Sequence, residues 1–428
     1  MLLIYTKFVS PRLNYICTFI FEEVLGISFL IISDKNYFKN YKGCKINYSE
    51  SDFTNAFNIS PHAILFETDI KPQTIETFKN ENNVLAFFKT DHSDYPFDIF
   101  AATFYLISRY EEYLPHTLDE YGRYAHQNSL AYKNNFLQIP IINIWVNDFA
   151  TELKKQFDLI KFLPKAFSFL PTYDIDMAWS YKNKGLLRNV GGFVKKPTIS
   201  RLKTLLGLQK DPFDCYTFLQ ELHTTYKLLP IYFILVAEQN GQYDKNILPS
   251  NLQFQQLIQL LAQQFSIGLH PSWSSNNKMN TLKNEKQILE KITNSSIKKS
   301  RQHYIKFSLP HGYQQLLDIG IVEDYSMGYG SINGFRASVA SPFFWYNIKT
   351  ETTTALRIYP FCFMDANCLY EQKLTLKQSY EELLHYYNIV QQVHGQFIPI
   401  FHNSFLGNIN EFKGWLPLYQ QFIAQVEQ

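Results

Sequence analysis

The second half of the chain alternates between short apolar runs and longer segments with helical periodicity. The apolar runs have the length of buried strands and cover residues 166–176, 230–237, 266–270, 355–365 and 396–403. The longer segments place apolar side chains on one face and cover residues 213–229, 252–265 and 374–395. Strands that alternate with helices predict an α/β fold with a parallel sheet or a β/α barrel.

The first part of the chain mixes short apolar runs with polar, turn-rich stretches. Its clearest element is a helix expected over residues 97–114, with Glu111 and Glu112 at a solvated end and a weak surface ion pair between Arg109 and Glu112. The pattern changes near residue 160. We therefore expect a smaller α/β or α+β domain of unknown function at 1–160, followed by the alternating domain at 161–428.

Acidic residues and histidines stand at the ends of the predicted strands, where parallel α/β folds collect their chemistry. They are Asp174, Asp176, His270, Asp365 and His402. Asp174 and Asp176 are two residues apart, so an extended backbone points both carboxylates to the same side. One of them can bind a metal while the other stays free as a general base. Helix capping or a turn is the alternative, and it is less common for two aspartates than for one.

Composition narrows the classes of function. Lys and Arg number 40 and Asp and Glu 38, and the net charge of +2 argues against a dedicated nucleic-acid-binding protein. Five scattered cysteines without a CxxC spacing predict neither a thiolate zinc site nor a disulfide framework. Lys7 and Arg12 interrupt the first apolar runs, so we expect neither a signal peptide nor a membrane span, and a cytoplasmic location.

Two features of composition allow more than one interpretation. Aromatic residues make up 17% of the chain, which codon bias and core packing explain in most places. Trp273 and Trp345 lie near the predicted chemistry and are candidates for stacking on sugar rings. Residues 177–210 carry eight basic and no acidic side chains. This stretch is either a solvated insertion or a basic amphipathic segment that contacts an anionic inner membrane face or a phosphate-bearing substrate.

The order of these motifs resembles a known family. An aspartate-bearing strand end (TYDID), SIGLHPSW, SRQHYIKF, GFRAS and FIPIFHN follow one another as in the NodB-homology polysaccharide deacetylases, carbohydrate esterase family 4. The sequence is most similar to a bacterial branch in which an uncharacterised N-terminal domain with an SRYEEYLP-like helix precedes the deacetylase domain. Residues 108–123 carry that segment here, so the resemblance extends over nearly the whole chain.

The resemblance implies a distorted (β/α) barrel and metal-dependent removal of an acetyl group from a sugar. By the same resemblance, Asp174 matches the general base and Asp176 the metal-binding carboxylate. His270 matches the first metal histidine, and Arg301 the arginine that orients the base. His402 matches the histidine that acts as general acid. The implied cofactor is a divalent ion of the zinc, cobalt or nickel type.

The sequence departs from the family pattern at two places. Ile175 separates the two aspartates, which are usually adjacent, so their base and ligand roles could be exchanged. Ser274 stands at the position of the second metal histidine, and serine is a poor ligand for such metals. His303 is the candidate third ligand, and packing or substrate contact is the alternative.

Four residues are candidates for contact with the substrate: Trp273, Tyr304, Arg336 and Asp365. Arg336, in GFRAS, either binds an anionic group of the substrate or forms a structural pair. Asp365 either orients a catalytic side chain or merely ends its strand.

The predicted function is a carbohydrate deacetylase, a hydrolase of carbon–nitrogen bonds other than peptide bonds, in the biosynthesis of surface glycans. A cytoplasmic enzyme of this kind suits nucleotide- or lipid-linked sugars better than finished polymers. The first alternative is a degenerate deacetylase that binds glycan without cutting it. The second is a scaffold of a glycan-assembly complex that docks through residues 1–160.

Overall fold

The N-terminal part of the protein is built on a small parallel sheet. The computed structural model describes residues 1–91, 93–195 and 198–427. Four strands lie in the order β2-β1-β3-β4, and β5 and β6 form a separate antiparallel pair. The strands are β1 (Leu2–Tyr5), β2 (Phe29–Ile32), β3 (Lys45–Tyr48), β4 (Phe57–Ile59), β5 (Thr77–Lys79) and β6 (Leu85–Phe87).

Helix α3 lies at the centre of this part, and every one of its residues is buried. It is shorter than the helix expected over 97–114. Asp98 caps its first turn, and Arg109 adopts a left-handed backbone with a φ of 56° just beyond its end. The helices are α1 (Pro11–Cys17), α2 (Lys35–Asn40), α3 (Ile99–Ile107), α4 (Leu130–Lys133) and α5 (Ile141–Gln156).

The larger part contains a nine-stranded sheet in the order β13-β14-β12-β11-β10-β9-β8-β17-β15. Neighbouring strands run parallel except for the hairpin β13–β14, and β7 and β16 form a separate parallel pair. The strands are β7 (Ser168–Phe169), β8 (Thr172–Ile175), β9 (Ile231–Ile234), β10 (Ser266–Leu269), β11 (Lys299–Ser300), β12 (Glu323–Asp324), β13 (Phe343–Asn347), β14 (Thr352–Ile358), β15 (Phe363–Met364), β16 (Gln396–Phe397) and β17 (Pro399–His402).

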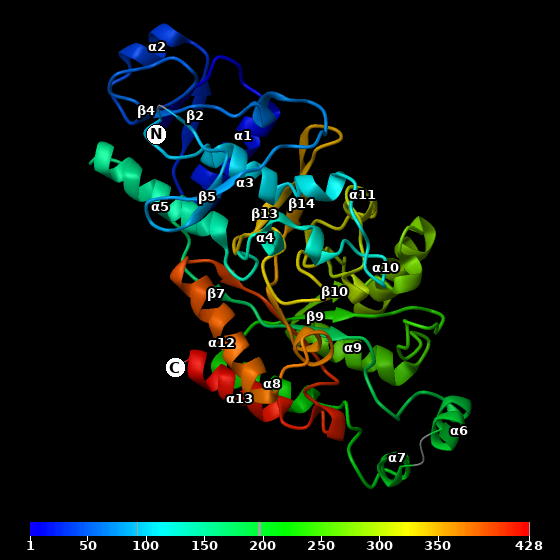
Figure 1. The fold of residues 1–428 in the computed structure, drawn as a ribbon. Helices are drawn as coiled ribbons and strands as arrows, with labels where there is room; N and C mark the ends of the chain where they lie inside the picture. The colour runs from blue at the N-terminus through cyan, green and yellow to red at the C-terminus, as the bar shows by residue number, and fades with distance from the viewer. Residues whose placement is uncertain (92, 196–197, 428) are drawn as a thin grey trace.

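Helices connect these strands, and those predicted at 213–229, 252–265 and 374–395 form as α8, α9 and α12. In Figure 1, α6 and α7 project from one end of this part. The helices are α6 (Leu186–Lys195), α7 (Ile199–Leu205), α8 (Tyr216–Tyr226), α9 (Leu252–Gln264), α10 (Met279–Thr293), α11 (His311–Asp318), α12 (Leu376–Gln392) and α13 (Trp415–Val426). Among the described residues, no helix combines the length and apolar composition needed to cross a membrane.

The nine-stranded sheet is curled. The evidence is that side chains at the ends of strands that are not neighbours in the sheet contact each other. Arg301, which follows β11, donates from Nη1 to Thr172 Oγ1 at 2.8 Å and to Asp174 Oδ1 at 2.9 Å on β8. Two strands, β10 and β9, lie between them in the sheet. The predicted fold class, a distorted (β/α) barrel preceded by a smaller N-terminal domain, is confirmed.

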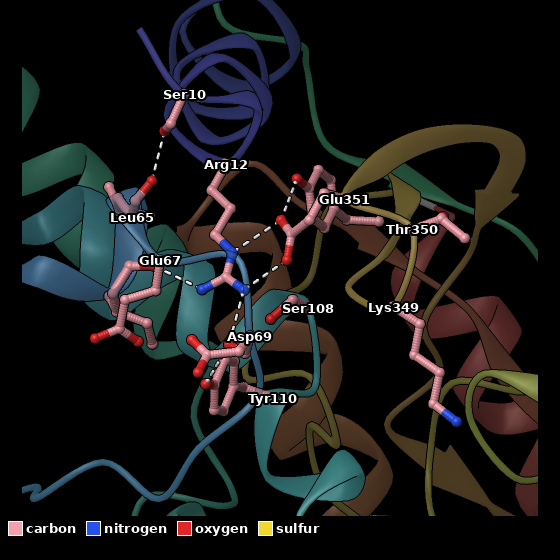
Figure 2. Close-up of polar contacts among 12 residues, drawn as sticks. Ser10, Arg12, Leu65, Glu67, Asp69, Ser108, Tyr110, Lys349, Thr350 and Glu351 are labelled. Carbon is pink, nitrogen blue, oxygen red and sulfur yellow. Dashed lines mark hydrogen bonds and ion pairs between the residues drawn. The ribbon is translucent and has the colours of Figure 1, made fainter. Parts of the chain in front are cut away.

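Arg12 joins the two parts (Figure 2). Its buried guanidinium donates from Nε and Nη2 to both carboxylate oxygens of Glu351, at 2.9 and 2.6 Å, in the β13–β14 hairpin. It also donates to the carbonyl oxygens of Ile64 and Asp69. A forked arginine–carboxylate pair of this kind fixes orientation as well as contact, so the two parts are held in one arrangement here.

A second ionic cluster lies between the two parts and corrects a prediction. Glu112 is 4% exposed and accepts hydrogen bonds from Arg336 Nε and Nη2, at 2.9 and 2.6 Å, and from Arg109 Nε at 2.8 Å. Glu111 is also buried, 8% exposed, and pairs with Arg109. The prediction that Glu111 and Glu112 end a solvated helix is therefore wrong. Helix α3 ends at Ile107, and the separate turn that follows Arg109 directs Glu112 toward the barrel.

Candidate metal centre and catalytic site

A cavity of about 400 Å³ opens where β8, β10, β11 and β17 end. Six of the residues singled out in the sequence line it, and they are Asp174, Asp176, His270, His303, Tyr304 and His402. Carboxyl ends of parallel strands meet at one edge of a sheet, which brings these residues together from distant parts of the chain.

Asp176 lies in the middle of the histidines. Its Oδ1 is 3.1 Å from His270 Nε2. Its Oδ2 is 3.7 Å from His303 Nε2 and 3.8 Å from His402 Nε2. Burial favours the neutral form of Asp176, but the neighbouring histidines, with positive charge on His303 first among them, outweigh burial and hold the pKa of this carboxyl well below its usual range.

The orientation of His270 leaves two acceptors facing each other. Nδ1 lies 2.5 Å from the carbonyl oxygen of Arg301, which can only accept, so Nδ1 carries the proton in the neutral ring. Nε2 then presents a lone pair toward Asp176 Oδ1. These two buried atoms have no hydrogen-bond partner among the described residues. Two facing acceptors need a cation between them, either a proton or a metal ion.

His303 is oriented in the same way by a residue that the sequence reasoning missed. Its Nδ1 lies 3.0 Å from Asp244 Oδ1, so Nε2 faces Asp176. Burial lowers the pKa of His303, but Asp176 and Asp244 outweigh burial and raise it to about 9. Ser274 donates its hydroxyl to Asp244 Oδ2 at 2.7 Å. The serine at the expected position of a second metal histidine therefore supports the carboxylate that orients His303.

The side chains fit a divalent metal ion of the zinc type. One ligand atom from each of Asp176, His270 and His303 can be chosen so that all three lie within 4.8 Å of one another. Two imidazoles and one carboxylate make a common ligand set for such ions, and three protein ligands leave a position open for water or substrate. The carbonyl oxygen of Arg301 and the Asp244 carboxylate are the second-sphere partners that ligating histidines usually have.

Asp174 lies apart from this ligand set, in a different environment. It is 2% exposed, and its Oδ1 accepts from Arg301 Nη1 at 2.9 Å. Its Oδ2 is 3.8 Å from His270 Nε2, farther than Asp176 Oδ1. Arg301 is itself held by Tyr325, whose carbonyl oxygen accepts from Nε at 3.0 Å. Of the two aspartates, Asp176 is thus the one among the histidines and Asp174 the one paired with the arginine.

Asp365 orients His402. Its Oδ1 lies 2.6 Å from His402 Nδ1, and its Oδ2 accepts the backbone N–H of His402 at 2.7 Å. Burial lowers the pKa of His402, but Asp365, Asp176 and Asp174 together outweigh burial and raise it to about 10. The imidazole is therefore positively charged at neutral pH, with Nε2 directed toward the cavity residues.

The candidates for contact with a sugar differ in where they lie in the structure. Tyr304 lines the cavity. One face of the Trp273 indole stacks on Tyr243 at 4.0 Å between ring centroids, and Lys306 Nζ lies 3.4 Å from its ring centroid. Trp273 therefore has no free face for a sugar. Trp345 is 2% exposed and belongs to the core, so its expected stacking role is wrong.

Arg336 and Asp365 also need correction as substrate contacts. Arg336 is buried and forms the structural pair with Glu112, which was the second alternative. Asp365 is fully buried, and both of its oxygens accept hydrogen bonds from neighbouring donors, chiefly His402, so it orients the imidazole of His402. Neither lines the cavity.

Three functional candidates escaped the sequence reasoning. Asp244 lies in a polar loop ten residues after β9 ends at Ile234, so it carries no strand-end signal. Tyr121 and Arg123 come from the N-terminal part and also line the cavity. Both lie in the segment 108–123, which resembles the family. That resemblance by itself gives no role to their side chains.

A comparison with known families matches the N-terminal part of the chain. Residues 2–158 match a family described as a family of unknown function, DUF7033. No curated protein matches the chain.

Solved structures resemble the chain at low identity. A Mycobacterium smegmatis protein assigned as a polysaccharide deacetylase is 13% identical with a TM-score of 0.41, and the match covers 61% of this chain and 84% of that one. The Puue allantoinase is 10% identical with a TM-score of 0.39, over 61% and 84%. A polysaccharide deacetylase from Bacillus cereus is 9% identical with a TM-score of 0.31, over 60% and 87%. Polysaccharide deacetylases, the family that the motifs resemble, are thus among the structures found.

Proposed function

We propose that the protein is a metal-dependent carbohydrate deacetylase. The observation that carries the proposal is the division of labour in one cavity. Asp176, His270 and His303 face a common point, whereas Asp174 and His402 each have a separate partner that prepares them for proton transfer. Metal-assisted hydrolysis with acid–base catalysis uses these three parts: a cation site, a base and an acid.

Asp176, His270 and His303 would hold the ion. When bound, a divalent ion supplies a Lewis acid that polarises a carbonyl group and lowers the pKa of a water molecule. The carbonyl oxygen of Arg301 and the carboxylate of Asp244 each face the Nδ1 nitrogen of an imidazole, so that Nε2 of both rings is directed at the ion. Binding of the ion would displace any proton on these Nε2 atoms.

Asp174 and His402 would carry the protons. Asp174 accepts a proton from the attacking water, whose oxygen forms a bond to the acetyl carbon, and Arg301 holds this carboxylate in place. When the bond between the acetyl carbon and the sugar nitrogen breaks, His402 donates its proton to the leaving amine. The products are acetate and a free amino-sugar, and Asp365 keeps His402 oriented through the cycle.

The lining of the cavity supports a sugar as substrate. Aromatic side chains stand beside amides and hydroxyls there, and a sugar ring presents apolar faces and polar edges to such a wall. The aromatic residues are Tyr121, Tyr304, Tyr370 and Phe405. We propose amino-sugar precursors of surface glycans, linked to a nucleotide or a lipid, as the substrate class.

Metal analysis and acetate release test the proposal together. We expect stoichiometric zinc, cobalt or nickel in the purified protein and release of acetate from acetylated amino-sugars that chelation abolishes. His270→Ala should lose both, whereas His311→Ala, which removes an exposed imidazole outside the cavity, should lose neither. Stoichiometric glycan binding without metal or acetate release would favour the degenerate, binding-only alternative. Activity that survives in Asp174→Asn and His402→Ala would contradict the proposed roles.

We also propose that α6 and α7 contact an anionic membrane. The support is a basic stretch at 177–210 that exposes aliphatic side chains, among them Ile199 at 74%, Leu202 at 52% and Leu206 at 64%. Aliphatic groups flanked by lysine and arginine suit an anionic bilayer surface. This insertion follows β8, the strand that carries Asp174, and so lies on the side of the cavity.

Vesicle flotation tests the membrane contact. The protein should float with phosphatidylglycerol vesicles and much less with phosphatidylcholine vesicles. Exchange of Leu202 and Leu206 for glutamate should abolish flotation. The same exchange at Leu159 and Leu163, which are 88% and 76% exposed elsewhere, is the matched control and should not. Equal flotation of both double variants would contradict the contact.

A further inference from the structure

The N-terminal part forms one wall of the cavity. Tyr121 and Arg123 line it together with the barrel residues, although no motif of the proposed chemistry lies in residues 1–160. We propose that this part belongs to the substrate site. In this arrangement Arg123 is a positioning residue for the turn that carries His303. Tyr121 is a residue that selects the substrate. This inference rests on the proposed function and assigns the N-terminal part a place in it.

The segment that reaches the cavity is a tight, self-supporting turn. Asp119 Oδ1 accepts the backbone N–H groups of Tyr121 and Arg123 at 3.0 and 2.9 Å. The carbonyl oxygen of Asp119 accepts the N–H of Gly122, whose φ of 70° suits glycine. Asp119 Oδ2 also accepts from Arg123 Nε at 2.6 Å. The guanidinium therefore leaves the turn in a fixed direction.

Arg123 holds a strained turn of the barrel. Its Nη1 donates to the carbonyl oxygen of Tyr304 at 2.9 Å. Tyr304 and Ile305 both have a left-handed backbone, with φ of 58° and 54°, which residues with a β-carbon rarely adopt in succession. His303 immediately precedes them, and its Nε2 faces Asp176. A hydrogen bond that secures Tyr304 therefore secures the direction of the ligating imidazole.

A glycine in the barrel makes room for this contact. A β-carbon built at Gly330 would lie 2.1 Å from Arg123 Nη1 and 3.1 Å from the carbonyl oxygen of Tyr304. Gly330 itself lines the cavity, and its φ does not require a glycine. Its lack of a side chain is thus explained by the approach of the guanidinium, so the barrel is shaped for an arginine supplied by the N-terminal part.

Tyr121 forms part of the wall of the cavity. Its ring centroid lies 4.7 Å from the guanidinium carbon of Arg123 and 5.4 Å from the ring centroid of Tyr304. Tyr121 thus extends the aromatic surface of Tyr304 across the boundary between the two parts. A sugar ring that enters the cavity would meet side chains of both parts.

Metal affinity and steady-state kinetics of the full chain test the inference. Arg123→Ala should weaken zinc or cobalt binding about 10-fold, a typical effect of losing outer support for a ligating histidine, and lower kcat/KM by about 10- to 100-fold. Arg123→Lys should recover part of both, because an ammonium can still donate to Tyr304. Gly330→Ala should reproduce the defect while Arg123 is present. Tyr121→Ala should raise KM with kcat unchanged.

The matched control weakens a different contact between the two parts, the ion pair of Arg12 and Glu351. Glu351→Gln weakens the Arg12 pair (Figure 2), neither residue of which lines the cavity, and should leave metal affinity and KM unchanged. Wild-type metal affinity and KM in Arg123→Ala would overturn this inference and leave the proposed function untouched. Defects in Glu351→Gln as large as those in Arg123→Ala would do the same. A parent protein that neither binds metal nor releases acetate would instead overturn the proposed function, and the metal arm of this inference with it.

Discussion

Two buried arginine–carboxylate pairs, Arg301–Asp174 and Arg336–Glu112, use the same groups in different ways. Arg301 reaches Asp174 with one nitrogen, Nη1, at 2.9 Å from Oδ1, and Oδ2 of Asp174 faces His270 in the cavity. Arg336 holds Glu112 with two nitrogens, at 2.9 and 2.6 Å. The first carboxylate keeps an oxygen for a proton, and the second has both oxygens bound.

Burial does not separate the two pairs, because Asp174 is 2% exposed and Glu112 is 4% exposed. The two pairs differ in whether the carboxylate still has an oxygen that its arginine does not bind. Burial alone would raise the pKa of Glu112, but Arg336 and Arg109 outweigh burial and lower it to about 2, so this group takes no proton near neutral pH. Under the proposed function, the buried pair that serves catalysis is the one whose carboxylate still turns an oxygen to the cavity.

Replacing Asp174 by Asn should cause the largest loss of activity. The amide can still accept a hydrogen bond from Arg301, but it cannot take a proton, so kcat for acetate release should fall by about 10³-fold. Chemical denaturation should show a smaller loss of stability than for the Glu112 variant described next. An unchanged kcat would show that the free oxygen of Asp174 is not used.

Replacing Glu112 by Gln should act on stability. Two guanidinium groups lose their carboxylate charge, and the free energy of unfolding should fall by about 3–5 kcal/mol. Because the pKa of Glu112 is lowered from near 4.5 to about 2, its stabilising effect is present above pH 4.5 and lost as the pH falls toward 2. The stability difference between parent and variant should shrink over that range. The kcat per folded molecule should not change, and a large drop would place Glu112 in the chemistry.

Asp365 sharpens the comparison, because it has both oxygens bound and yet serves the cavity through His402. Asp365→Asn should lower kcat by about 10²-fold, since the imidazole loses its orientation and its charge partner. KM should stay the same, because the buried carboxylate does not line the cavity. A rise in KM with kcat preserved would return Asp365 to the substrate-contact role expected from the sequence.

Ser274→Ala should have the smallest effect. Asp244 loses the hydroxyl donor at 2.7 Å and keeps the backbone N–H groups of Trp273 and Ser274. One neutral hydrogen bond contributes about 0.5–1.5 kcal/mol, so zinc affinity in a competition titration should fall by roughly 2- to 10-fold. Asp244→Asn should weaken binding by about 10- to 100-fold. Equal losses in the two variants would mean that the serine hydroxyl does more than support Asp244.

Much of the barrel was predictable from local pattern. Apolar runs ending in polar residues anticipated β8, β10 and β17, and helical periodicity anticipated α8, α9 and α12. Aspartates and histidines at those strand ends were expected to meet, because parallel strands end at a common edge. The helix expected over 97–114 forms only as α3, which ends at Ile107. Glu111 and Glu112 were expected to be solvated. No local pattern shows that the guanidinium of Arg336 lies against Glu112.

The candidate site was predictable where it follows strand ends and unpredictable where it depends on loops. Asp174, Asp176, His270 and His402 line one cavity as their positions in the alternating pattern suggested. Asp244 sits ten residues beyond its strand, and only the path of the loop brings it to His303. Aromatic type alone could not tell the covered Trp273 from the tyrosines that face the cavity.

The sequence by itself determined the alternation of strands and helices and the chemical groups at the strand ends, because both depend on neighbours along the chain. Tertiary structure decided the rest. It decided which carboxylate faces the histidines, which pairs with Arg301, and that Arg123 of the N-terminal part reaches the turn after His303. Those outcomes depend on the curl of the sheet and on the packing of two parts against each other, which join residues more than ninety positions apart.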